Sequence, residues 1–149
     1  EIDLIAVTKD ITPKVVTTEK APRPKANYNQ AVIAGDLVFI AGQLASDFKT
    51  GVPPEATVDP AFRFYGSEIE SQTEYIMKNI QTVLEEAGTS LEKTVKAQTF
   101  LTDINDFYGY DKIWRQWFDT PPPRTTIELA GDGLLVPGTK VEIDLIVAL

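Results

Sequence analysis

The last segment of the chain, residues 121–149, restricts the fold more than any other stretch. It opens with three consecutive prolines, which end any preceding helix because each lacks an N–H donor and has a fixed φ. The β-branched run that follows, residues 125–129, predicts a strand. After a glycine-rich turn, apolar and polar residues alternate over residues 140–148, which predicts a second strand with one face in the core. The domain is therefore expected to be built on a sheet that contains both strands.

Three charged residues in this segment suggest a binding site. Arg124 stands at the start of the first predicted strand, and the period of two places Glu142 and Asp144 together on one face of the second. An arginine and a carboxylate on nearby strands can bind an anion and a water molecule. The alternative is a surface arginine with two solvated acids, which is the commoner arrangement for these residue types.

The chain has the length and composition of one globular domain, with 149 residues of which 43% are hydrophobic and 24% charged. No apolar run approaches the length of a membrane span and no signal-peptide pattern is present, so we expect no membrane partner. The net charge of −8, without a basic cluster, opposes binding to phosphate backbones and predicts no nucleic-acid partner. The absence of cysteine fits a cytoplasmic protein.

The sequence contains neither histidine nor cysteine, which removes several classes of active site. Ser-His-Asp and Cys-His catalysis are excluded, and so is zinc held by His or Cys ligands. An enzyme of this composition has to use carboxylates, Arg, Lys, Tyr, hydroxyls, backbone groups and water. No clustered Asp/Glu loop suits a hard metal ion, so no metal site is expected.

Two apolar runs, residues 28–34 and 37–41, predict a β-hairpin in the first half of the chain. They flank Gly35-Asp36, a two-residue turn of the kind that joins antiparallel strands. A further strand is predicted at residues 95–101. The polar, proline-containing residues 12–24 have no periodicity and predict a lead-in without regular structure.

Two helices are predicted between these strands. The first begins after Ser67, which forms a capping-box pattern with Glu70, and ends at Gly88. The second extends to about residue 118, and its apolar side consists of aromatic and aliphatic residues that we expect in the core: Phe107, Tyr110, Ile113, Trp114 and Trp117. The order hairpin, helix, strand, helix, strand, strand predicts an α+β fold with both helices on one face of the sheet. The other face carries Glu142 and needs a cover, which predicts an oligomer.

A short repeat links the two ends of the chain. Residues 1–5 and 142–146 are both EIDLI. Such self-similarity indicates duplication, so we interpret residues 1–10 as the closing strand of a preceding copy or as an N-terminal extension. The alternative is two similar strands that arose by chance. Residues 11–149 then form a single domain.

Three stretches together resemble the reactive intermediate deaminase (Rid, or YjgF) family of small imine and enamine hydrolases: residues 26–51, 80–107 and 121–148. The resemblance implies a chorismate-mutase-like α+β fold with a mixed sheet. It also implies a homotrimer, or a pseudo-trimer of tandem domains, with sites in clefts between subunits. The implied activity is hydrolysis, without a cofactor, of imine or enamine compounds that bear a carboxylate, to give keto acids and ammonia.

The resemblance also assigns roles to individual residues. Arg124 matches the arginine that pairs with the substrate carboxylate, and Glu142 matches the glutamate that holds the attacking water. Thr126 stands where many members carry cysteine. The remaining substrate-binding matches are the pocket tyrosine Tyr28 and the cleft-lining segment Ala41, Gly42 and Gln43.

The segment at residues 57–66 is longer than in the short members of the family and is rich in aromatic residues. Phe64 and Tyr65 are expected either to cover the pocket and enlarge its substrate range, or to pack on the start of the first helix. Three function classes stay open: a deaminase, for small imines or for a larger ring-derived substrate; a non-catalytic ligand-binding module; and a ribonuclease. The charge of −8 and the lack of histidine argue against the ribonuclease.

Overall fold

The computed structural model of the protein describes residues 4–131 and 133–149. A mixed sheet with the strand order β1-β2-β3-β6-β4-β5 forms the centre of the fold. Neighbouring strands are antiparallel except β4 and β5, which are parallel. The elements are β1 (Lys14–Val16), β2 (Ala31–Ala34), β3 (Leu37–Leu44), α1 (Glu68–Ala87), β4 (Thr94–Leu101), α2 (Phe107–Trp114), β5 (Arg124–Glu128) and β6 (Val141–Ala148), with 3-10 turns at Pro54–Ala56, Leu91–Lys93 and Ile104–Asp106. The predicted α+β fold is confirmed.

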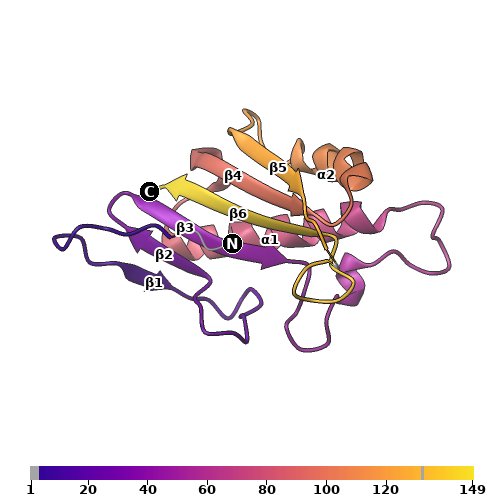
Figure 1. Ribbon diagram of the computed structural model, residues 1–149, viewed down its shortest axis with the longest axis horizontal. Coiled ribbons are helices and arrows are strands. Elements are labelled where there is room, and N and C mark those ends of the chain that lie inside the picture. Colours follow the sequence, from indigo (N-terminus) through magenta and orange to yellow (C-terminus); the bar gives the residue numbers. More distant parts are fainter. Residues whose placement is uncertain (1–3, 132) are drawn as a thin grey trace.

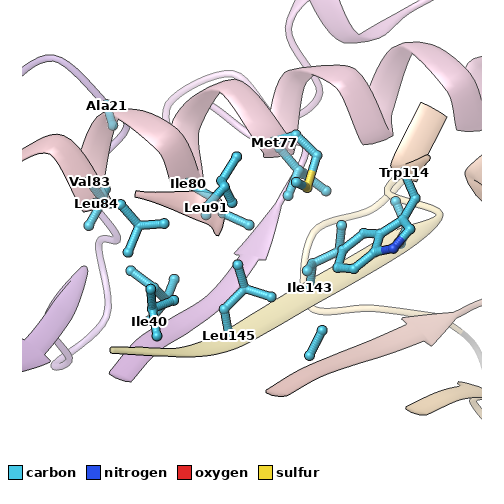
Figure 2. Packing of buried hydrophobic residues seen from close by; sticks show 14 of the residues in the cluster. Ala21, Ile40, Met77, Ile80, Val83, Leu84, Leu91, Trp114, Ile143 and Leu145 are labelled. Carbon is cyan, nitrogen blue, oxygen red and sulfur yellow. The ribbon is translucent and has the colours of Figure 1, made fainter. Parts of the chain in front are cut away.

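Both helices lie on the same face of the sheet, as predicted, and α1 runs along the central strands (Figure 1). The alternating residues Ile143 and Leu145 of β6 are buried on this face (Figure 2). They pack against Met77 and Ile80 of α1, which have no exposed surface. Burying a side chain of this size contributes about 1.5–3 kcal/mol, so this layer supplies much of the stability. The opposite face, which carries Glu142, is called the open face below.

The first helix ends as predicted but begins differently. Gly88 terminates α1 in the left-handed conformation, with φ of 84°. Ser67 is the N-cap residue, yet its side chain makes no capping hydrogen bond. Glu70 instead accepts a hydrogen bond from Lys112 Nζ at 2.7 Å, which ties α1 to α2. The predicted capping box is therefore wrong, because an interhelical ion pair takes its glutamate.

Two other predictions need correction. Residues 14–16, predicted to lack regular structure, form the edge strand β1, in which Val15 pairs with Val32. This three-residue strand is defined by its partner, so no local periodicity reveals it. The second helix ends at Trp114 rather than near residue 118, although Phe118 stays buried against the Trp114 ring at a centroid distance of 4.6 Å.

The N-terminal residues lie beside the open face without joining the sheet. Residues 4–8 form no strand, and Ile5 and Val7 border a hollow on that face. Residues 1–3, most of the EIDLI repeat, lie outside the described part of the chain, so the duplication hypothesis stays a prediction. Within the described ranges, no helix has the length and apolar character needed to cross a membrane.

Candidate active site

The open face contains a hollow of about 590 Å³. Its walls are mainly apolar, from Val32, Phe39, Phe100 and Ile146. Its polar lining residues are Lys96, Gln98, Glu142 and Asp144. An apolar hollow with a few converging polar groups is the usual form of a small-molecule site.

Glu142 owes its position to Gly42 in the neighbouring strand. The register between β3 and β6 shifts between Ile40 and Gln43, so Gly42 lies in a bulge. A Cβ atom at Gly42 would stand 2.9 Å from Cδ of Glu142 and still closer to its Oε1. The carboxylate therefore lies directly against the backbone of β3, and any residue larger than glycine would displace it.

Glu142 has the electrostatic character of a weak base. Burial in the hollow raises the pKa of its carboxyl group, and the charge of Asp144 raises it further. Asp144 is held in turn by Gln98, whose Nε2 donates to Oδ2 at 3.3 Å. Burial also raises the pKa of Tyr28, and the charge of Glu142 adds to that effect, although Tyr28 does not line the hollow. A carboxylate with a raised pKa accepts a proton more readily near neutral pH.

Arg124 lies on the opposite side of the sheet. It pairs in register with the core residue Ala97, so both side chains point to the helix-covered face. The guanidinium group packs over α2, where Nη2 donates to Oδ1 of Asp111 at 2.9 Å. The Arg124 side chain is only 16% exposed as a result.

One chain therefore does not bring Arg124 and Glu142 together. The β4 residue that pairs with Glu142 is Phe100, which lines the hollow on the open face, whereas Arg124 faces α2. The two predicted catalytic residues occupy opposite faces of the same sheet. A site that uses both has to take them from different chains.

Thr126 lies two residues beyond Arg124 and points to the same face, opposite the buried Thr99. Its Oγ1 is buried and has no hydrogen-bond partner within the described part of the chain. A buried hydroxyl without a partner costs about 1–3 kcal/mol, so it is a candidate to bind a ligand or a second chain.

Of the predicted cleft-lining residues Ala41, Gly42 and Gln43, one lines the hollow and the other two make contacts within the fold. Gln43 is buried on the helix-covered side, and its Nε2 donates to the Ala41 carbonyl at 3.1 Å. The Ala41 N–H donates to the Gln30 carbonyl at 3.1 Å. Only Gly42 of the three lines the hollow.

The aromatic loop, residues 57–66, lies away from the open-face hollow that contains Glu142. Phe64 is 93% exposed and Tyr65 is 89% exposed, and neither lines the hollow. Figure 1 shows this loop, before α1, extending beyond the end of the sheet. The nearest ring contact of Tyr65 is to Phe62, at 6.5 Å. Within one chain, the loop does not cover the open-face hollow.

Sequence reasoning missed the environment of Arg124. Asp111 binds it, and Phe107, Tyr110 and Trp114 surround it. These four residues recur at helical spacing, which is a usable signal, but the aromatic residues were assigned to the core alone. Among the described residues, no group of three or more acidic side chains gathers as a metal site would require.

Comparisons with known proteins give consistent matches. The family model described as Endoribonuclease L-PSP matches residues 18–149. Reactive Intermediate Deaminase A, chloroplastic, from Arabidopsis thaliana is 34% identical over 137 residues, which are 91% of this chain and 66% of that protein.

Solved structures match over nearly their whole length. YyfA from Yersinia pestis, a Rid-family protein of unknown function, has a TM-score of 0.76 at 30% identity, covering 93% of this chain and 100% of its own. Escherichia coli TdcF with bound serine has a TM-score of 0.74 at 26% identity, covering 91% and 98% of the two chains.

Proposed function

Because the chain belongs to the Rid (YjgF) family, we propose that it is a hydrolase that deaminates imine or enamine compounds bearing a carboxylate. Water adds to the C=N carbon and gives a carbinolamine, which expels ammonia and leaves a keto acid. The water oxygen becomes the keto oxygen, and both water protons end on the nitrogen, one during addition and one as ammonia leaves, so the reaction needs no redox partner. The relative named Reactive Intermediate Deaminase A supports this reaction class.

The observation that carries the proposal is the placement of Glu142. It lies in an apolar hollow, against Gly42, and burial raises the pKa of its carboxyl group. An imine carbon is already electrophilic, so water needs only to be positioned and partly deprotonated. Glu142 would accept each of the two water protons in turn, first during addition and then as the carbinolamine breaks down, and deliver it to the nitrogen. No covalent nucleophile is needed, which suits a chain without histidine or cysteine.

Arg124 would bind the substrate carboxylate, for which a planar guanidinium is suited. Since it faces α2 while Glu142 faces the hollow, the proposal requires Arg124 of one subunit and Glu142 of another. A homotrimer or a tandem-domain pseudo-trimer with sites between subunits would meet this requirement. Such an assembly would also cover the apolar open face.

The first test measures ammonia release from 2-iminopropionate, generated in situ, by the wild type, Arg124→Ala and Glu142→Gln. We expect rapid wild-type turnover and its loss in both variants. Mixing the two variants under conditions that exchange subunits should restore activity, because about a quarter of randomly formed sites would combine an intact arginine with an intact glutamate. An inactive wild type would refute the proposed function, and failure of the mixture to recover would refute the shared site.

A ribonuclease is the second candidate, because the matching family model is described as an endoribonuclease. The net charge of −8 opposes RNA binding, and no histidine is present for acid–base cleavage. We expect no cleavage of single-stranded RNA at low salt by protein that is active on 2-iminopropionate. Cleavage that is lost in Glu142→Gln would favour this candidate instead.

A further inference from the structure

Helix α2 holds Arg124 on several sides. The guanidinium carbon lies 5.5 Å from the ring centre of Phe107, 4.9 Å from that of Tyr110 and 5.2 Å from that of Trp114. Each distance is within the range of a cation–π contact. We call these three rings the aromatic cradle. They enclose the cation, and the Tyr110 hydroxyl also interacts with the Arg124 guanidinium.

Asp111 adds a negatively charged hydrogen-bond acceptor to these contacts. Its Oδ1 accepts from Arg124 Nη2 at 2.9 Å, and its Oδ2 accepts from Arg115 Nε at 2.6 Å. Asp111 is only 14% exposed, whereas Arg115 is 74% exposed. The carboxylate is therefore shared between a partly buried arginine and a surface arginine.

The cradle itself is firmly placed. The Tyr110 hydroxyl lies 2.7 Å from Thr99 Oγ1 of β4, which fixes this ring to the sheet. Gly109 brings α2 so close to α1 that a Cβ atom there would lie 2.6 Å from Cγ2 of Ile69. Lys112 also pairs with Glu70 of α1 at 2.7 Å. Because α2 is fixed to both β4 and α1, Asp111 can hold Arg124 against a rigid support.

We propose that Asp111 is a positioning residue, which holds the Arg124 guanidinium in one orientation so that its remaining N–H groups meet the substrate carboxylate. The inference rests on the proposed function of Arg124 as the carboxylate-binding residue. A guanidinium has five N–H donors, so one bond to Asp111 leaves enough for a bidentate carboxylate. Ordering the long side chain before the substrate arrives removes a cost of binding.

A second electrostatic effect of Asp111 acts in the opposite direction. Its negative charge weakens the attraction of Arg124 for another carboxylate, so removing that charge alone would tighten substrate binding. If Asp111 mainly orders Arg124, its removal should weaken substrate binding. If its charge mainly weakens the attraction of Arg124 for the substrate, its removal should tighten binding. Asp111→Asn keeps an acceptor oxygen and removes the charge, whereas Asp111→Ala removes both.

The experiment measures pyruvate binding to the intact oligomer by titration of tryptophan fluorescence, since the Trp114 ring lies beside Arg124. Positioning predicts that Asp111→Ala weakens binding about tenfold, the scale of the rotamer freedom of a free arginine, and that Asp111→Asn weakens it less. The matched control is Arg115→Gln, which removes the other ion pair of Asp111 and should change affinity less than about twofold. Tighter or unchanged binding in Asp111→Ala would overturn the inference.

Kinetics with 2-iminopropionate separate positioning from damage to the fold. Asp111→Ala should raise KM about tenfold with little change in kcat. The thermal stability of Asp111→Asn should be closer to that of the wild type than the stability of Asp111→Ala is. A kcat loss without a KM change would overturn the inference. If the wild type binds pyruvate but does not hydrolyse the imine, the proposed function is refuted. The pyruvate titrations of the Asp111 variants then still test whether Asp111 positions Arg124. If the wild type binds no pyruvate, both fail.

Discussion

The two faces of the sheet present the two halves of the candidate site in different ways. On the open face, Glu142 lies in an apolar hollow where burial raises the pKa of its carboxyl group. On the helix-covered face, Arg124 is charge-paired with Asp111 and surrounded by aromatic rings. The open face favours the protonated form of the Glu142 carboxyl group, whereas the helix-covered face stabilises the positive charge of Arg124. Each half is therefore prepared within its own chain, so the proposed assembly would only have to bring the two halves together.

Loss of either half should produce the largest effect. Arg124→Ala should cost about 2–5 kcal/mol in transition-state stabilisation for carboxylated substrates, because it removes a desolvated ion pair. An imine without a carboxylate should lose much less. Steady-state kinetics on a matched pair of substrates measures the difference. Equal losses on both would mean that Arg124 acts through the fold and not through the carboxylate.

Gly42→Ala should damage the open-face half alone. The added methyl group overlaps the Glu142 carboxylate, so either that side chain or strand β3 has to move. We expect a destabilisation of about 1–3 kcal/mol and a large fall in kcat, with unchanged pyruvate binding. Chemical denaturation and fluorescence titration measure the two properties separately. A loss of pyruvate binding equal to that of Arg124→Ala would contradict the independence of the halves.

The pH dependence should follow Glu142. Its folded pKa lies above the ordinary value of 4.5, so kcat/KM should fall as the pH drops through that raised pKa and the base becomes protonated. The stability contribution has the opposite sign: the protonated form favours folding, and this contribution is lost as pH rises from the unfolded pKa through the folded one. Glu142→Gln should therefore be more stable than the wild type at neutral pH, and this advantage should shrink below pH 4.5. Denaturation at both pH values checks the sign.

Thr126→Val should have a smaller effect that depends on assembly. The hydroxyl is buried without a partner in the described part of the chain, so its removal should stabilise an isolated subunit by up to about 1 kcal/mol. If the oligomer or a substrate provides its partner, the same substitution should instead raise KM or weaken association. Thermal unfolding and kinetics on the same preparation decide between the two outcomes.

The smallest effect is expected in the aromatic loop. Phe64→Ala with Tyr65→Ala should change stability by less than about 0.5 kcal/mol, because both side chains are almost fully exposed. Turnover of 2-iminopropionate should stay within about twofold of the wild type. A selective loss for bulky imines alone would indicate that the loop reaches the site of a neighbouring subunit.

Local patterns in the sequence were sufficient for most of the secondary structure. The alternation in β6, the glycine that ends α1 and the turn at Gly35, where φ is 61°, each depend on interactions within a few residues. The short strand β1 exists only because it pairs with β2, so local patterns did not reveal it. The Ser67–Glu70 capping box failed because Glu70 binds Lys112, 42 residues away.

The candidate site divides in the same way. The resemblance to the Rid family was enough to select Arg124 and Glu142, and the family itself is confirmed by the comparisons. Tertiary structure alone placed them on opposite faces of the sheet, because side-chain direction depends on register and on which face the helices cover. It also decided that Gly42 makes room for a carboxylate and that Asp111 binds Arg124. These contacts join residues distant in sequence, so packing of the whole domain was needed to define them.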